Sequence, residues 1–168
     1  VLAACANDKD KALDYFDKAQ SLYNEGDLHR ASVQLKNALK KDETLADAYF
    51  MQAKIFRAWR EWKPMYAFLL KTLEHNPRHL EANSMLAQVY VEAGKHDRAK
   101  EPMAVLADLA PETSEYWVLQ GAMHLHSAEY RQALDYAERS LQRRYGIVVG
   151  RHRHQMHAVT MAENLELM

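Results

Sequence analysis

The sequence contains little cysteine, proline or glycine, and its charges almost cancel. Its 168 residues include one Cys, four Pro and five Gly, and 22 Lys and Arg stand against 23 Asp and Glu. One cysteine can form neither an internal disulfide nor a cysteine-based zinc site. A β-sandwich needs many turns, so the shortage of glycine and proline argues against that fold. The net charge of −1 gives no overall attraction to nucleic acid or to anionic lipid.

The remaining composition is that of an ordered, helix-rich protein. Hydrophobic residues make up 48% of the chain and charged residues 27%, close to the averages of globular proteins, so bulk disorder is not expected. The length suits one domain with a hydrophobic core. No apolar run approaches the roughly 20 residues that would span a bilayer.

The sequence repeats with a period of 34 residues. Four segments follow one another without insertion: 12–45, 46–79, 80–113 and 114–147. Each predicts two amphipathic helices joined by a tight turn. Gly26 and Gly94 mark this turn in repeats one and three, whereas Arg60 and Ala128 occupy the same place in repeats two and four. Pro102 falls inside the second helix of repeat three, so that helix either kinks there or begins near residue 101.

Small residues recur at two places of each repeat. The eighth place holds Ala19, Ala53, Ala87 and Gly121, and the twentieth holds Ala31, Met65, Ala99 and Ala133. A small residue at both places lets the two helices of a hairpin cross closely, with Met65 as the oversized exception. Large residues recur on one face at helical spacing and are expected to fill the core. His124 stands at one of these large places, where other repeats have Leu, Phe or Tyr.

This 34-residue helix–turn–helix pattern resembles the tetratricopeptide repeat (TPR) family. The resemblance implies an all-α fold, a right-handed α-solenoid of about four hairpins plus a C-terminal helix. The first helices would line a concave groove and the second helices a convex back. Residues 1–11 would form an N-terminal tether. Residues 148–168 would form a capping helix or part of a fifth repeat, and their apolar residues leave open a pairing with a second molecule.

The resemblance also indicates a binding surface, because TPR ligands usually meet fixed places on the first helices. The residues expected there are Phe16, Gln20, Tyr23, Phe50, Met51, Lys54, Arg57, Met85, Gln88, Val118 and Leu119. Their apolar members form a stripe with a polar border, which is typical of a site for an amphipathic helix or an extended peptide. The alternative is that a terminal helix or a second copy of the protein covers the stripe, which would make a homo-oligomer.

One ligand class of the family is not expected. Chaperone-binding TPR proteins hold a C-terminal carboxylate in a clamp of Lys, Asn and Arg. The corresponding places here hold Phe16, Gln20, Met51, Glu81 and Met85. The clamp is missing, and the carboxylate of Glu81 would repel that of the ligand.

The N-terminal residues suggest a location. Leu2-Ala3-Ala4-Cys5 resembles a bacterial lipobox, in which the cysteine is lipidated. The alternative is a helical cap with an inert thiol. Residues 28–39 and 119–122 also resemble bacterial TPR lipoproteins associated with exopolysaccharide and exosortase export systems. Together these predict a periplasmic lipoprotein of the bacterial envelope, attached to the membrane only through Cys5, with a cytoplasmic protein as the alternative.

No enzyme, cofactor or metal site is expected. The sequence lacks a G-x-S-x-G motif, a glycine-rich phosphate loop and H-E-x-x-H. His152, His154 and His157 are too poorly aligned on a helix to supply three zinc ligands. Arginines between Arg139 and Arg153 form a basic run, but a nucleic-acid footprint normally makes the whole domain basic. The prediction is a scaffold that binds a protein or peptide and does not bind nucleic acid.

Overall fold

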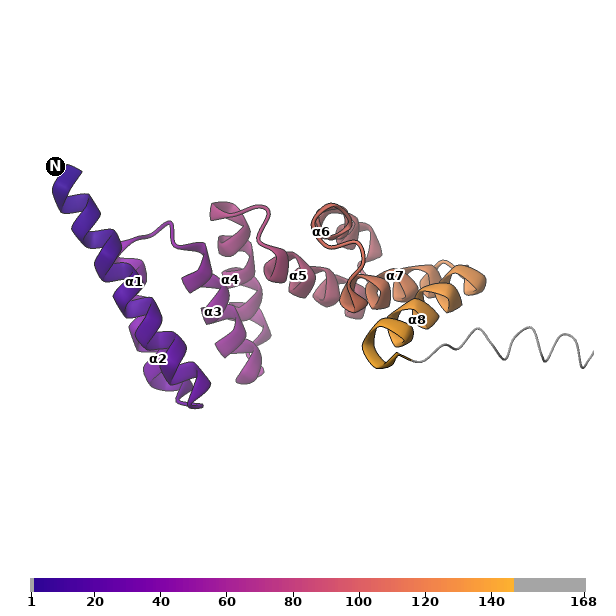
Figure 1. The fold of residues 1–168 in the computed structure, drawn as a ribbon, viewed down its shortest axis with the longest axis horizontal. Coiled ribbons are helices and arrows are strands. Elements are labelled where there is room, and N and C mark those ends of the chain that lie inside the picture. Colours follow the sequence, from indigo (N-terminus) through magenta and orange to yellow (C-terminus); the bar gives the residue numbers. More distant parts are fainter. Residues whose placement is uncertain (1, 147–168) are drawn as a thin grey trace, which may run out of the picture. The chain divides into compact units, whose positions relative to one another are not determined.

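The computed structural model describes residues 2–146, which form eight helices in succession (Figure 1). The helices are α1 (Leu2–Asn24), α2 (Leu28–Lys41), α3 (Ala46–Ala58), α4 (Trp62–His75), α5 (Leu80–Glu92), α6 (His96–Leu109), α7 (Ser114–His126) and α8 (Tyr130–Tyr145). No strand occurs within this range. The predicted all-α chain of helix hairpins is therefore confirmed, and α3, α5 and α7 begin at the predicted repeat starts. None of the described helices combines the length and the hydropathy needed to cross a bilayer.

Helix α1 begins at Leu2, so residues 2–11 continue the first helix of repeat one and do not form a separate segment. The predicted C-terminal helix in residues 148–168, with His152, His154 and His157, lies outside the described residues.

The chain divides into two compact units, residues 1–86 and 87–168, and the boundary falls within α5. The first unit contains the hairpins α1/α2 and α3/α4, whose helices lie side by side. In the second unit, the last part of α5 contacts α6, and α7 pairs with α8.

The four hairpin turns share one backbone conformation despite their different residues. Gly26 and Gly94 have φ of +86° and +68°, and Arg60 and Ala128 have φ of +61° and +58°. Each turn also has the same closing hydrogen bond. It joins Asp27 N to Leu22 O, Glu61 N to Phe56 O, Lys95 N to Tyr90 O and Glu129 N to His124 O, over 2.8–2.9 Å. This is the bond of a Schellman motif, which ends a helix with a left-handed residue. The turn geometry therefore persists even where the glycine is replaced.

The core of the first unit forms where α1, α2 and α3 meet. Ala19 and Ala31 are fully buried, so the absence of larger side chains lets α1 and α2 approach closely. Next to this core, the fully buried Gln52 of α3 donates from Nε2 to the backbone oxygen of Ser32 over 2.9 Å, and the Ser32 hydroxyl donates to Gln52 Oε1 over 3.1 Å. Because a buried amide is costly unless bonded, this pair ties α2 to α3 and thus repeat one to repeat two.

The second unit repeats this packing. Ala87 and Ala99 are fully buried, and they form a cluster with the buried Met103, Leu106 and Leu119. A Cβ atom added at Gly121 would lie 3.3 Å from the backbone oxygen of Ala133, a tight contact that would require α7 and α8 to move apart by a few tenths of an ångström. Helix α6 begins at His96 and contains the buried Pro102, so a start near residue 101 is wrong.

Candidate protein-binding surfaces

The histidines of the described chain are engaged in packing. The ring of His124 stacks on Tyr136 of α8 at 5.3 Å, which fits its large place in the repeat, and His124 Nδ1 lies 2.6 Å from Glu129 Oε2. His126 stacks on His96 with ring centroids 3.6 Å apart. Within residues 2–146, no three His, Cys, Asp or Glu side chains come close enough to share a metal ion.

The structure divides the predicted groove residues into two groups. Met51, Met85 and Leu119 are only 6–8% exposed. Their side chains contribute to helix packing, because apolar residues at these places are covered by neighbouring helices. A partner cannot reach them in this conformation, so a partner surface depends on the other predicted residues, of which Gln20, Arg57, Gln88 and Val118 are exposed.

Six of the remaining predicted residues lie in the first unit, on the first helices of its two hairpins, and are called here the α1/α3 face. They are Phe16, Gln20, Tyr23, Phe50, Lys54 and Arg57. Lys54 Nζ lies 4.7 Å from the ring centroid of Tyr23 and 6.0 Å from that of Phe50. A cation within about 6 Å of an aromatic ring is attracted to its face. This attraction holds the ammonium group of α3 against α1, beside two half-buried aromatic rings.

A histidine that sequence reasoning missed extends this face. The ring of His79 lies 4.6 Å from that of Phe50. The amide N–H of Ala82 donates to His79 Nδ1 over 3.2 Å, so Nε2 carries the proton and donates to Asp47 Oδ1 over 3.1 Å. His79 is therefore a side-chain cap of α5 that also bonds to α3. Only one feature of the sequence indicates this role, the place of His79 just before a first helix. Histidine itself does not suggest a cap, because Ser, Thr, Asp and Asn are the usual capping residues.

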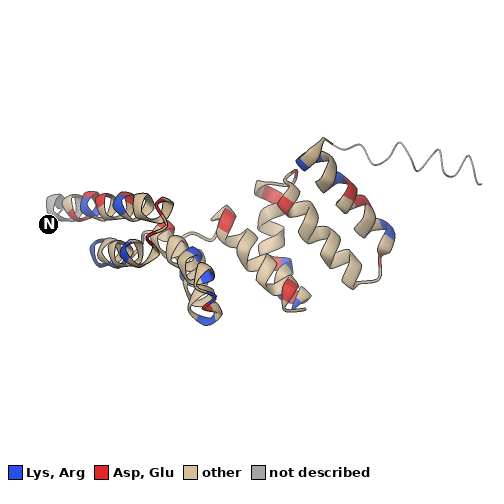
Figure 2. Ribbon diagram, turned by 90° about the horizontal axis from the view of Figure 1, so that it is seen from below, with Lys and Arg blue, Asp and Glu red and all other residues tan. Residues whose placement is uncertain are grey.

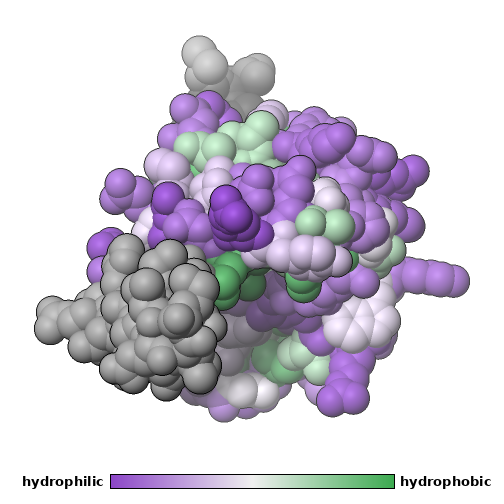
Figure 3. All heavy atoms as spheres, turned by 90° about the vertical axis from the view of Figure 1, so that its right-hand side faces the viewer, coloured by the Kyte–Doolittle hydropathy of each residue, from purple (hydrophilic) through white to green (hydrophobic). Residues whose placement is uncertain are grey.

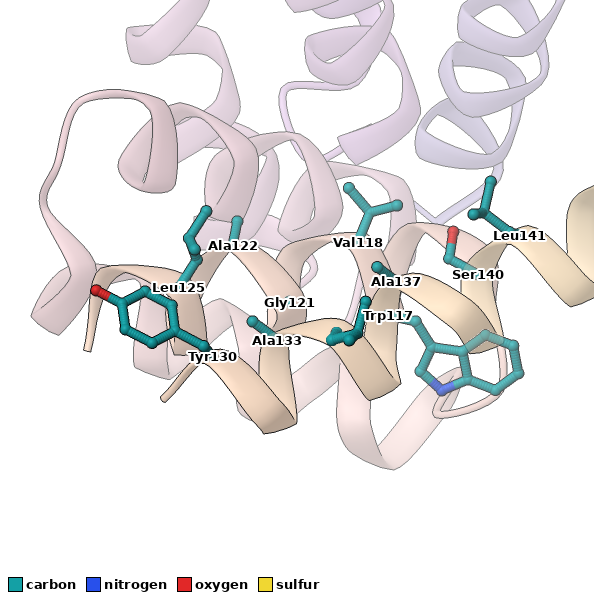
Figure 4. A pocket seen from close by; sticks show the side chains of 11 residues that line it. Trp117, Val118, Gly121, Ala122, Leu125, Tyr130, Ala133, Ala137, Ser140 and Leu141 are labelled. Carbon is teal, nitrogen blue, oxygen red and sulfur yellow. The ribbon is translucent and has the colours of Figure 1, made fainter. Parts of the chain in front are cut away.

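The second surface is an apolar groove between α7 and α8, called here the terminal groove (Figure 4). Its volume is about 500 Å³, and its lining is Trp117, Val118, Gly121, Ala122, Leu125, Tyr130, Ala133, Leu134, Ala137, Ser140 and Leu141. Leu125 and Tyr130 stand at one end of the groove, and Trp117 and Leu141 at the other. Val118, Leu125 and Leu134 are each about half exposed. Figure 3, which views the side of Figure 1 where α7 and α8 lie, shows apolar residues recessed among hydrophilic ones.

Charged side chains are mixed in sign along the helices. Figure 2 shows acidic and basic residues alternating along α1. Arg139, from the predicted basic run, is paired with Asp135 over 2.9 Å. At the start of α2, the Asp27 carboxylate accepts hydrogen bonds from Arg30. The bond from the backbone N–H of Arg30 contributes most, and the bond from its guanidinium next, to holding the pKa of Asp27 below the usual value. The Arg139–Asp135 ion pair therefore neutralises one of the positive charges of the basic run.

Comparison with known proteins points to one class. The family model described as "Tetratricopeptide repeat" matches residues 67–123. Anaphase-promoting complex subunit 3 of Schizosaccharomyces pombe is 26% identical over 106 residues, which is 63% of this chain. That match spans only 16% of the yeast protein. These findings support the tetratricopeptide repeat family predicted from the 34-residue period.

Solved structures show the same fold. MamA of Desulfovibrio magneticus RS-1 aligns with a TM-score of 0.67 at 15% identity, over 79% of this chain and 75% of that one. Pseudomonas aeruginosa pilF gives 0.67 at 23% identity, over 81% and 62%. The first TPR of Spaghetti (RPAP3), solved with the HSP90 peptide SRMEEVD, gives 0.58 at 15% identity, over 76% and 93%. The chain therefore has the fold of TPR proteins, while its resemblance to export-system lipoproteins stays a prediction.

Proposed function

We propose that this chain is a non-catalytic scaffold that binds a peptide or helix of another protein on its α1/α3 face. A TPR scaffold is suited to protein–protein interaction. The observation that carries the more specific proposal is the position of Lys54 between the rings of Tyr23 and Phe50. These residues come from two consecutive first helices, so a segment crossing both would meet a cation and two aromatic rings at once.

The chemistry of this face favours a segment with apolar and acidic side chains. Tyr23 and Phe50 offer apolar surface, and Lys54 and the exposed Arg57 offer positive charge on the same helix. Binding would not use a carboxylate clamp, because Gln20 and Glu81 occupy clamp places. The partner's acidic side chains, and not its chain terminus, are therefore the expected contacts of Lys54 and Arg57.

Affinity capture from the native organism, followed by mass spectrometry, tests this function. The chain is compared with Lys54→Glu and with Lys40→Glu, a matched control on the second helix α2, where Lys40 is exposed. We expect one or more proteins to be captured by the wild type and by the control but lost from Lys54→Glu. Equal capture by both variants would reject the α1/α3 face. Circular dichroism checks that both variants keep their helices.

Self-association is a second candidate function, favoured by the exposed apolar residues of the terminal groove. It predicts a dimer or larger species in light scattering, with a mass that rises with protein concentration. A monomer at all concentrations would reject it.

A role in the bacterial envelope is proposed from the Leu2-Ala3-Ala4-Cys5 sequence. A lipid on Cys5 would attach the scaffold to a membrane and place the α1/α3 face near envelope proteins. The test is metabolic labelling with a radioactive fatty acid in the native organism. We expect label in the wild-type protein and none in Cys5→Ser, whereas an unlabelled wild type would argue for the cytoplasmic alternative.

A further inference from the structure

The outer side of helix α2 carries charge of one sign. Its 14 residues include four cations but no Asp or Glu. Every other described helix that contains Lys or Arg also contains an acidic residue. The overall net charge of −1 therefore conceals a local cationic surface. It is called here the α2 face and consists of Arg30, Val33, Lys36, Lys40 and Lys41.

The packing of α2 explains why these residues share the solvent side. Ala31, Leu35 and Ala38 are fully buried, and their spacing of three and four residues puts them on one side of the helix. The other side, with all four cations, is exposed, and Val33 among them is 53% exposed. Because the apolar side of α2 is already buried in the protein, the helix cannot insert into a bilayer. Only its cationic side is available for contact.

Acidic neighbours neutralise only part of the α2 face. Arg30 Nε lies 2.5 Å from Asp27 Oδ2, and Lys41 Nζ lies 3.2 Å from Asp8 Oδ1. The two remaining lysines form no ion pair with any residue of the range 2–146. Exposed ion pairs add little stability, so the two paired cations can also turn to another anion at small cost.

The C-terminal end of α2 lies beside the start of α1. The contact between Lys41 and Asp8 joins the two helices there. Within α1, Asp8 follows Cys5 by three residues, which is about 4.5 Å along the helix axis. A lipid on Cys5, as proposed above, would bring this end of α2 to the headgroups of the same membrane. Membrane anchors often combine a lipid with a cluster of Lys and Arg.

We propose that the α2 face docks on an anionic lipid surface by contact with the headgroups. Helix α2 is about 21 Å long, so its cations can meet several headgroups at once. The attraction acts within about one Debye length, so a local cluster is sufficient. A nucleic-acid footprint would instead make the whole domain basic. The α1/α3 face lies on other helices of the unit and stays available to a protein partner.

Vesicle flotation of the whole chain with Cys5→Ser tests this docking without any attached lipid. We expect binding to vesicles of phosphatidylglycerol and none to vesicles of phosphatidylcholine. Binding should disappear in about 1 M salt, where charges are screened beyond about 3 Å. Lys36→Glu combined with Lys40→Glu should weaken binding at least about tenfold, because each lysine near an anionic surface contributes about fivefold. The corresponding pair of Gln substitutions should give a smaller loss.

The matched control is Lys54→Glu combined with Arg57→Glu, which makes the same change of charge on the α1/α3 face. This control should bind the vesicles as tightly as the unsubstituted face does. Three results would overturn the proposal: no binding to phosphatidylglycerol, equal losses in the two double variants, or displacement from the vesicles by equimolar duplex DNA. The last would identify nucleic acid as the occupant. Because every protein in this test lacks Cys5, the result is independent of the fatty-acid labelling that tests the anchor.

Discussion

Replacing Ala128 by glycine should stabilise the protein, although the change removes a methyl group. Ala128 occupies the turn of the last hairpin with φ of +58°, a conformation that L-residues adopt at a cost. Gly94 occupies the same place in repeat three with φ of +68°. A Cβ built at Gly94 meets nothing within 4 Å, so the conformation, and not a clash, favours glycine at this place.

The magnitude follows from two opposing terms. A left-handed conformation costs an L-residue about 1–2 kcal/mol. Glycine loses about 0.4–1 kcal/mol more chain entropy on folding than alanine does. The free energy of unfolding of Ala128→Gly should therefore rise by about 0.5–1 kcal/mol, and Gly94→Ala should lower it by a similar amount. For a chain of this size, that corresponds to a melting temperature shift of about 1–4 °C.

Urea unfolding followed by circular dichroism measures both changes, with an unchanged slope showing that the unfolded state is the same. The control is Ala104→Gly on an exposed face inside α6, where the same substitution should destabilise by about 1 kcal/mol. Opposite signs for Ala128→Gly and Ala104→Gly would support the left-handed turn. Destabilisation by both variants would refute it.

The remaining predictions concern a close contact, a buried amide and a helix cap. Gly121→Ala should destabilise the second unit in thermal melts, because the new Cβ would meet a backbone oxygen of α8 at 3.3 Å. Gln52→Ala should lower the free energy of unfolding by about 2–4 kcal/mol in urea titrations, since it leaves a cavity and removes both bonds to Ser32; a loss below about 0.5 kcal/mol would contradict this pairing. Asp27→Ala should lower the melting temperature at neutral pH. Because the folded-state pKa of Asp27 is lowered, its contribution is present above the unfolded-state pKa and is lost as pH falls through the folded one, so the difference between the two proteins should vanish in acid.

Much of the fold could be predicted because the repeat fixes both the 34-residue period and the place of each residue within it. Small residues such as Ala19 and Ala31 stand where two helices cross, and the structure buries them completely. The turn at Ala128 could be placed only from the period, since alanine itself gives no turn signal. The 34-residue period therefore predicted more of the fold than the residue types alone could.

The binding surface could be predicted only in part. Met51 and Met85 occupy ligand-contacting places of the family, but they are buried in this chain. A repeat pattern places a residue on the first helix, whereas its exposure depends on how the next hairpin covers it. His79 was missed because its role depends on the folded structure. Its bond to Asp47 joins residues 32 positions apart in the sequence, and its bond to Ala82 requires that Nδ1 of the ring carry no proton.

The central claim is that Lys54 and its aromatic neighbours form the contact surface for a protein partner. Isothermal titration with the captured partner tests this most directly, using the wild type, Lys54→Glu and Lys40→Glu. The account predicts a dissociation constant at least about tenfold higher for Lys54→Glu, because the substitution reverses a charge at the contact. The dissociation constant of Lys40→Glu should be unchanged. Equal affinities for all three proteins would contradict it.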